Sequence, residues 1–133
     1  MDERDTLADL GGEPYLFQLL VPKAYDIRVA VIGSEAYAVG IGSQSAAGSE
    51  VGWRRGDTSD LDHWVETLPE NLAEQCVSLV ASYGLAFGAI DLARRADGGY
   101  AFFELNPNRQ WAWLERRTGI PLRSRLADLL LGP

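Results

Sequence analysis

The chain has 133 residues, of which 47% are apolar, 10% aromatic and 23% charged. This length suits a single domain with one core, and the apolar fraction excludes a wholly disordered chain. Twelve lysine and arginine residues against 19 acidic ones give a net charge of −7 at pH 7, which disfavours binding to nucleic acid. The single cysteine, Cys76, cannot form an internal disulfide, so a disulfide-stapled secreted domain is excluded.

The sequence shows no sign of membrane attachment or export. Its first ten residues have neither the basic start nor the apolar run of a signal peptide. The apolar stretches elsewhere are far shorter than the roughly 20 residues that span a bilayer. We therefore expect a cytoplasmic protein with no membrane partner.

The N-terminal half predicts a short helix and three strands. Residues 2–10 favour one or two helical turns, and the apolar run Tyr15–Val21 predicts a buried strand. Alternation of apolar and other residues over Asp26–Gly33 and again over Ala36–Ile41 predicts two strands joined as a β-hairpin. Residues 42–62 have no regular pattern, which is typical of a functional or disordered loop.

The C-terminal half predicts a helix, two strands and two closing helices. The first helix begins at Pro69 and runs to about Tyr83, and the strands cover Ala86–Ala93 and Tyr100–Leu105. The closing helices cover about Gln110–Thr118 and Leu122–Leu131. This order predicts an α+β domain with a largely antiparallel sheet and helices packed on one of its faces.

Several single residues are best explained by structural roles. His63 is the only histidine, so we expect a partly exposed structural residue and no catalytic triad. Cys76 lies on the apolar face of its helix and is expected to be buried. On the first closing helix Trp111, Trp113 and Leu114 are expected to form packing contacts, with dimerisation as a further way to cover them.

The strongest chemical signal comes from the two strands that flank Asp97-Gly98. If these two residues form the hairpin loop, Asp91 lies opposite Glu104. If the loop is Gly98-Gly99 instead, Asp91 lies opposite Asn106. Glu104 and Asn106 share a face because they are two residues apart, so both registers gather all three side chains. A three-residue loop would swap the faces.

Two carboxylates that face each other between apolar strands repel one another unless a cation lies between them. Carboxylate and amide oxygens are ligands that Mg²⁺ prefers, and the absence of His and Cys disfavours zinc and copper. The residues therefore allow a magnesium site. They also allow Asp91 and Glu104 to be solvated edge-strand residues, with Asn106 as a cap at the strand end.

A family resemblance adds to this interpretation. Gly88–Leu92 (GAIDL) and Phe102–Trp113 (FFELNPNRQWAW) resemble the C-terminal half of the ATP-grasp ligases, in the branch of the ribosomal-protein glutamate ligase and the graspetide (microviridin-type) peptide maturases. Phe17–Val31 (FQLLVPKAYDIRVAV) resembles the hinge segment and Asp-x-Arg-Val strand of that family. Trp53-Arg54 resembles the maturases' Asp-Trp-Arg motif, and Glu115–Leu130 resembles their closing helices.

The resemblance implies a role for each matched polar residue. Asp91, Glu104 and Asn106 would bind the magnesium ions of Mg-ATP. Arg28 would stabilise the transferred phosphate and the acyl phosphate, and Arg54 would help to position substrate or phosphate. Both arginines suit this chemistry because the guanidinium fork matches phosphate and carboxylate oxygens.

The resemblance also implies where the ATP cofactor would bind, namely along the hinge at Gln18, Leu19 and Val21. The chain departs from the maturases at Leu19, where they usually carry an acidic residue. Without the resemblance, the strand pattern favours a different role for Arg28, as an exposed cation paired with Asp26.

Residues 1–133 would thus form the ATP-grasp C-terminal subdomain, without the N-terminal and middle subdomains. The implied function is the ATP- and Mg-binding part of a carboxylate–amine or carboxylate–alcohol ligase that acts through an acyl phosphate on a peptide or protein carboxylate. Lys23, the only lysine, lies at the hinge, whereas the family's phosphate-gripping lysines lie in the middle subdomain. A complementary ATP-grasp half is therefore an expected partner, and the alternative is a non-catalytic remnant that binds a peptide or partner protein.

Overall fold

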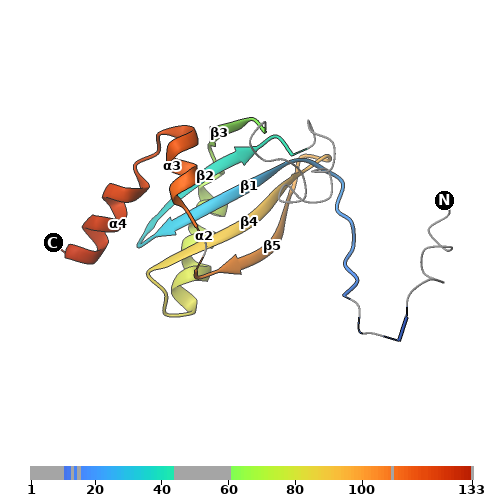
Figure 1. Cartoon of the computed structure of the whole chain (residues 1–133), viewed down its shortest axis with the longest axis horizontal. Helices are drawn as coiled ribbons and strands as arrows, with labels where there is room; N and C mark the ends of the chain where they lie inside the picture. Colours follow the sequence, from blue (N-terminus) through green and yellow to red (C-terminus); the bar gives the residue numbers. More distant parts are fainter. Residues whose placement is uncertain (1–10, 13, 15, 44–60, 109, 133) are drawn as a thin grey trace.

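The computed structural model describes residues 11–12, 14, 16–43, 61–108 and 110–132. Its centre is a five-stranded antiparallel sheet in the order β3-β2-β1-β4-β5 (Figure 1). The strands are β1 (Lys23–Ile32), β2 (Glu35–Ile41), β3 (His63–Glu66), β4 (Phe87–Arg95) and β5 (Tyr100–Asn106). The helices of the described part are α2 (Glu70–Ser82), α3 (Ala112–Thr118) and α4 (Leu122–Leu131). The predicted α+β class with an antiparallel sheet is confirmed.

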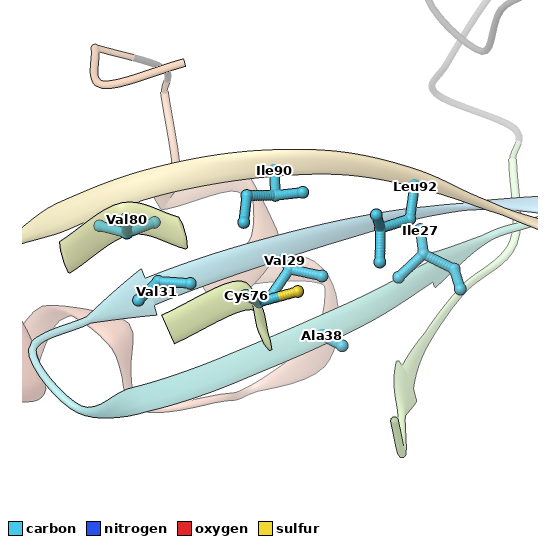
Figure 2. Packing of buried hydrophobic residues seen from close by; sticks show 8 residues of the cluster. All are labelled: Ile27, Val29, Val31, Ala38, Cys76, Val80, Ile90 and Leu92. Atoms are coloured by element: carbon cyan, nitrogen blue, oxygen red, sulfur yellow. The ribbon is translucent and has the colours of Figure 1, made fainter. Parts of the chain in front are cut away.

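One face of the sheet packs against α2. Ile27, Val29 and Val31 alternate along β1, as the sequence pattern predicts, and point to this face. Figure 2 shows Cys76 and Val80 of α2 packed against them, with Ala38, Ile90 and Leu92 completing the cluster. Each fully buried aliphatic side chain contributes about 1.5–3 kcal/mol of transfer free energy, so this cluster is a main source of stability. The predicted burial of Cys76 is confirmed.

The opposite face is covered by α3 and α4. Ala30, Ile32 and Val39 form a second buried cluster with Leu114 and Leu122 of these helices. The expectation that the helices pack on one face is therefore wrong: Figure 1 shows α3 and α2 on opposite sides of the sheet. The physical reason is that part of β1 is apolar on both of its faces, so each face needs a cover.

β3 is a short edge strand that the sequence pattern did not predict. Its residues pair with those of β2, and Trp64 lies directly opposite Gly40. The indole ring occupies the space that a side chain at Gly40 would need, since a Cβ there would lie 2.2 Å from Trp64 Cε2. Gly40 is thus required by a close side-chain contact, and four residues are too few to show a period-two pattern.

The predicted strand Tyr15–Val21 is wrong in its described part. Residues 16–20 have no regular secondary structure and are exposed, Leu19 to 90%. The first strand begins instead at Lys23, just after Pro22, whose carbonyl accepts a hydrogen bond from the Ala96 N–H at 3.1 Å. The predicted helix over residues 2–10 and most of the predicted loop lie outside the described residues.

The helix boundaries lie close to those predicted. The carbonyl of Pro69 accepts hydrogen bonds from the first turn of α2, and Gly84 (φ 69°) follows its end. Tyr83, expected on the apolar face of this helix, is 69% exposed instead, because the helix ends at Ser82. None of the described helices is long and apolar enough to cross a membrane.

Candidate functional site

The turn between β4 and β5 is longer than either loop considered from the sequence. The Arg95 N–H donates to the Gly99 carbonyl at 2.7 Å, so the loop consists of the three residues Ala96–Gly98. Gly98 has φ 95°, a conformation that favours glycine, and Asp97 Oδ1 accepts a hydrogen bond from the Gly99 N–H at 2.9 Å.

A β-bulge restores the pairing that the two-residue loop predicted. The turn alone would place Asp91 opposite Phe103. The register of β4 and β5 shifts by one residue before that point, so Phe103 becomes the extra residue and Asp91 pairs with Glu104. Asn106 pairs with Ala89 and therefore lies on the same face as Glu104. The predicted patch thus forms by a route that the sequence did not show.

The central strand β1 adds a cation to this patch. Arg28 is the direct partner of Asp91, and its Nε donates a hydrogen bond to Asp91 Oδ1. Arg28 is 2% exposed and Asp91 8%. The expectation of an exposed Arg28 paired with Asp26 is therefore wrong. Two buried charges are tolerated here because they compensate each other.

A second buried ion pair lies beside the first. Lys23 Nζ is 2.9 and 2.8 Å from the two carboxylate oxygens of Asp26. The side chains are 4% and 5% exposed. The i,i+3 spacing alone would put Lys23 on the other face of an ideal strand, but the register of β1 shifts between Lys23 and Tyr25. The sequence therefore carries little signal for this pair.

Asp91, Glu104 and Asn106 offer two carboxylates and one amide oxygen on adjacent strands. Asn106 Oδ1 accepts the Asn108 N–H at 2.9 Å, so it also acts as the strand-end cap that the sequence allowed. An amide oxygen has a second lone pair, so this hydrogen bond does not exclude metal binding. Within the described part of the chain no group of three or more His, Cys, Asp or Glu residues could hold a metal ion. Magnesium would therefore need the amide oxygen, with phosphate oxygens and water as further ligands.

The structure brings together Arg28, Asp91, Glu104 and Asn106, which we call the charged row. Of the other predicted residues, three lie outside this row, in the segment before β1. Gln18 and Leu19 are exposed and Val21 is half-buried in the segment that precedes β1. Arg54 lies outside the described residues.

His63 has the structural role that was expected. Its Nδ1 lies 2.7 Å from the Leu61 carbonyl, and its ring packs edge-on against Trp113 of α3 with a centroid distance of 5.5 Å. Burial lowers the pKa of His63 from its usual 6.5. Trp111 and Trp113 are packed against the second core cluster and Leu114 is buried within it, as predicted.

Comparison with solved structures finds proteins of similar fold. No protein-family model and no curated protein matches the chain. Among solved structures, it is similar to a RiPP-associated ATP-grasp ligase of Chryseobacterium gregarium, in complex with ADP and a leader and core peptide, with 27% identity and a TM-score of 0.78. It is also similar to two macrocyclases of Microcystis aeruginosa: MdnC bound with the precursor peptide MdnA (29% identity, TM-score 0.69) and MdnB (30%, 0.69).

The matched region covers 87%, 84% and 88% of this chain. It covers only 36%, 34% and 41% of the three structures, so the chain spans between a third and about two fifths of the proteins that it matches. The predicted resemblance to the ATP-grasp ligases of the peptide maturase branch is thereby confirmed, over a part of their length.

Proposed function

We propose that this chain is the C-terminal ATP-grasp subdomain of a peptide-modifying ligase, and that it binds ATP and Mg²⁺ with the charged row. The observation that carries the proposal is the row itself. Arg28, Asp91 and Glu104 are direct neighbours on three adjacent strands, and Asn106 follows on the same face. Of the three similar structures named above, two contain a peptide and one of these contains ADP, which supports a peptide substrate and a nucleotide cofactor here.

The donor set fits magnesium by its chemistry. Asp91, Glu104 and Asn106 would hold the ion through hard oxygen ligands, and the ion would supply positive charge that offsets the negative charge of the phosphates. Arg28 would keep Asp91 fixed and add a buried positive charge to the face on which the phosphates lie. The predicted contacts of ATP with Gln18, Leu19 and Val21, and of phosphate or substrate with Arg54, remain part of this proposal.

The reaction would couple a peptide side-chain carboxylate to an amine or hydroxyl in two steps. First, a carboxylate oxygen attacks the γ-phosphorus of ATP, the bond to the bridging oxygen breaks, and ADP leaves with the formation of an acyl phosphate. Then the amine or hydroxyl attacks the acyl carbon and expels inorganic phosphate, while its proton passes to a base or to water. The product would be a peptide with a new amide or ester bond, and we propose that the reaction takes place in the cytoplasm.

Calorimetry on the 133-residue chain tests the binding part of this proposal. We expect ADP to bind only when Mg²⁺ is present, and binding to be lost in Asn106→Ala. Asn108→Ala is the matched control, because Asn108 acts here through its backbone N–H, which alanine keeps. Absence of heat at millimolar Mg-ADP, or equal losses in the two variants, would contradict binding by this face.

A second candidate is a binding module without turnover. It is favoured by the ion pairs Arg28–Asp91 and Lys23–Asp26, because charges that are already compensated do not require a metal. A leader peptide that binds equally well with and without Mg-ADP would support this alternative, whereas peptide binding that requires Mg-ADP would support the ligase.

A further inference from the structure

We propose that Lys23 is a positioning residue of the charged row. By holding Asp26, Lys23 leaves Arg28 paired with Asp91, and this pairing keeps Asp91 beside Glu104. The effect on ligand binding rests on the proposed function, whereas the effect on the Arg28–Asp91 pair does not.

The first observation is that the side chains of Lys23 and Asp26 are buried as fully as those of Arg28 and Asp91. Those of Lys23 and Asp26 are 4% and 5% exposed, and the ammonium contacts both carboxylate oxygens at 2.8–2.9 Å. A buried ion pair is weak as a source of stability, because the desolvation of both charges offsets much of their attraction. Because the Lys23–Asp26 pair lies beside the candidate site, we infer that it helps to position the side chains of that site.

The second observation is the path of the lysine side chain. Lys23 starts on β1, yet its Nζ lies 5.9 Å from the ring centroid of Phe103 on β5. β4 lies between these two strands, so the ammonium lies above β4. The residue of β4 opposite Asp26 is Ala93, which is fully buried and small enough to let the lysine pass over it. Lys23 thus enters the face that carries the row.

The third observation is the position of Asp26. It lies two residues before Arg28 on one strand, so both side chains leave β1 on the same face, about 6.6 Å apart along the strand. An arginine side chain can span that distance. Without Lys23, the buried Asp26 carboxylate would lose its cation, and turning Arg28 toward Asp26 would replace it. Asp91 would then lose its ion pair with Arg28, which helps to fix it next to Glu104.

The test uses three variants of the full chain: Lys23→Met, Lys23→Arg, and the double variant Lys23→Met/Asp26→Leu. The direct readout is the Nε–H signal of Arg28 in the NMR spectrum of ¹⁵N-arginine-labelled protein, identified by its loss in Arg28→Gln. In Lys23→Met, we expect the Arg28 signal to shift toward the position that it has in the Asp91→Asn variant. We expect the wild-type position in Lys23→Arg, which keeps the cation, and in the double variant, which removes the competing carboxylate. An unchanged signal in Lys23→Met, or a shifted one in the double variant, would overturn the proposal.

The second readout is the affinity for Mg-ADP, measured by calorimetry. We expect Lys23→Met to bind about 10- to 100-fold more weakly, as is typical when an outer partner of a metal ligand is removed, with recovery in the double variant. If Lys23→Met does not fold, the double variant still tests the proposal, because a shifted Arg28 signal in that variant would overturn it. If the wild type binds no Mg-ADP, the proposed function fails, while the Arg28 signal still decides the role of Lys23.

Discussion

Replacing Arg28 by methionine is expected to destabilise the fold strongly, because it leaves a buried carboxylate without its cation. Arg28 and Asp91 lie in the middle of the sheet and are 2% and 8% exposed. Removal of one partner of such a pair typically costs about 3–5 kcal/mol. The opposing Glu104 carboxylate adds repulsion of like charges. The loss is a large share of the roughly 5–15 kcal/mol that stabilises most domains.

Urea unfolding followed by circular dichroism measures this loss. The control is Arg95→Met, which breaks an ion pair with Asp97 whose side chains are 47% and 60% exposed. Because such surface pairs are worth little, the control should lose less than about 1 kcal/mol. The double variant Arg28→Met/Asp91→Leu should recover most of the stability, since neither charge is then buried alone.

An Arg28→Met protein within about 1 kcal/mol of the wild type would refute the reasoning. A double variant as unstable as the single one would refute it as well.

Three further outcomes are expected. Gly40→Ala should lose about 1–3 kcal/mol in urea unfolding, because the new Cβ would lie 2.2 Å from Trp64 Cε2, whereas Gly11→Ala, with no atom within 4 Å, should be neutral. Burial lowers the pKa of His63 below 6.5, so the unfolded chain takes up a proton that the folded chain rejects. This contribution to stability is complete above pH 6.5 and is lost as the pH falls toward the folded-state pKa; unfolding curves between pH 7.5 and 5.5 should show it, and His63→Gln should lack it. Burial also raises the pKa of the Cys76 thiol, so a colorimetric disulfide reagent should react with it only after denaturant is added.

The pattern of apolar residues was sufficient to predict most of the fold. Alternation along β1 and β2 predicted their hairpin, and the helical spacing of Cys76 and Val80 predicted the buried face of α2. β3 was missed because a four-residue edge strand has too little pattern. The segment before β1 was wrongly predicted as a buried strand. A short apolar run does not by itself distinguish a strand in a core from an exposed irregular segment.

The candidate site was predictable within one hairpin and not beyond it. Asp91, Glu104 and Asn106 belong to consecutive strands, so loop length and the period of two were enough to bring them together. Even there, the three-residue loop shifts the strand register by one residue and the bulge at Phe103 shifts it back. No sequence rule predicted either feature. The pairing of Arg28 with Asp91 joins β1 to β4, two strands that are adjacent in space and 63 residues apart in sequence at this contact. Local spacing carries no information on such a contact.

The most direct test of the charged row uses manganese, which accepts oxygen ligands as magnesium does and broadens the NMR signals of nearby nuclei. Mn²⁺ and ADP are added to the ¹⁵N-labelled chain at a manganese level well below that of the protein. The proposed site predicts selective broadening at Ala89, Asp91, Glu104 and Asn106, with the signals of α2 on the opposite face retained. Broadening confined to exposed acidic residues such as Asp97, or no selective broadening at all, would contradict a metal and nucleotide site on this face.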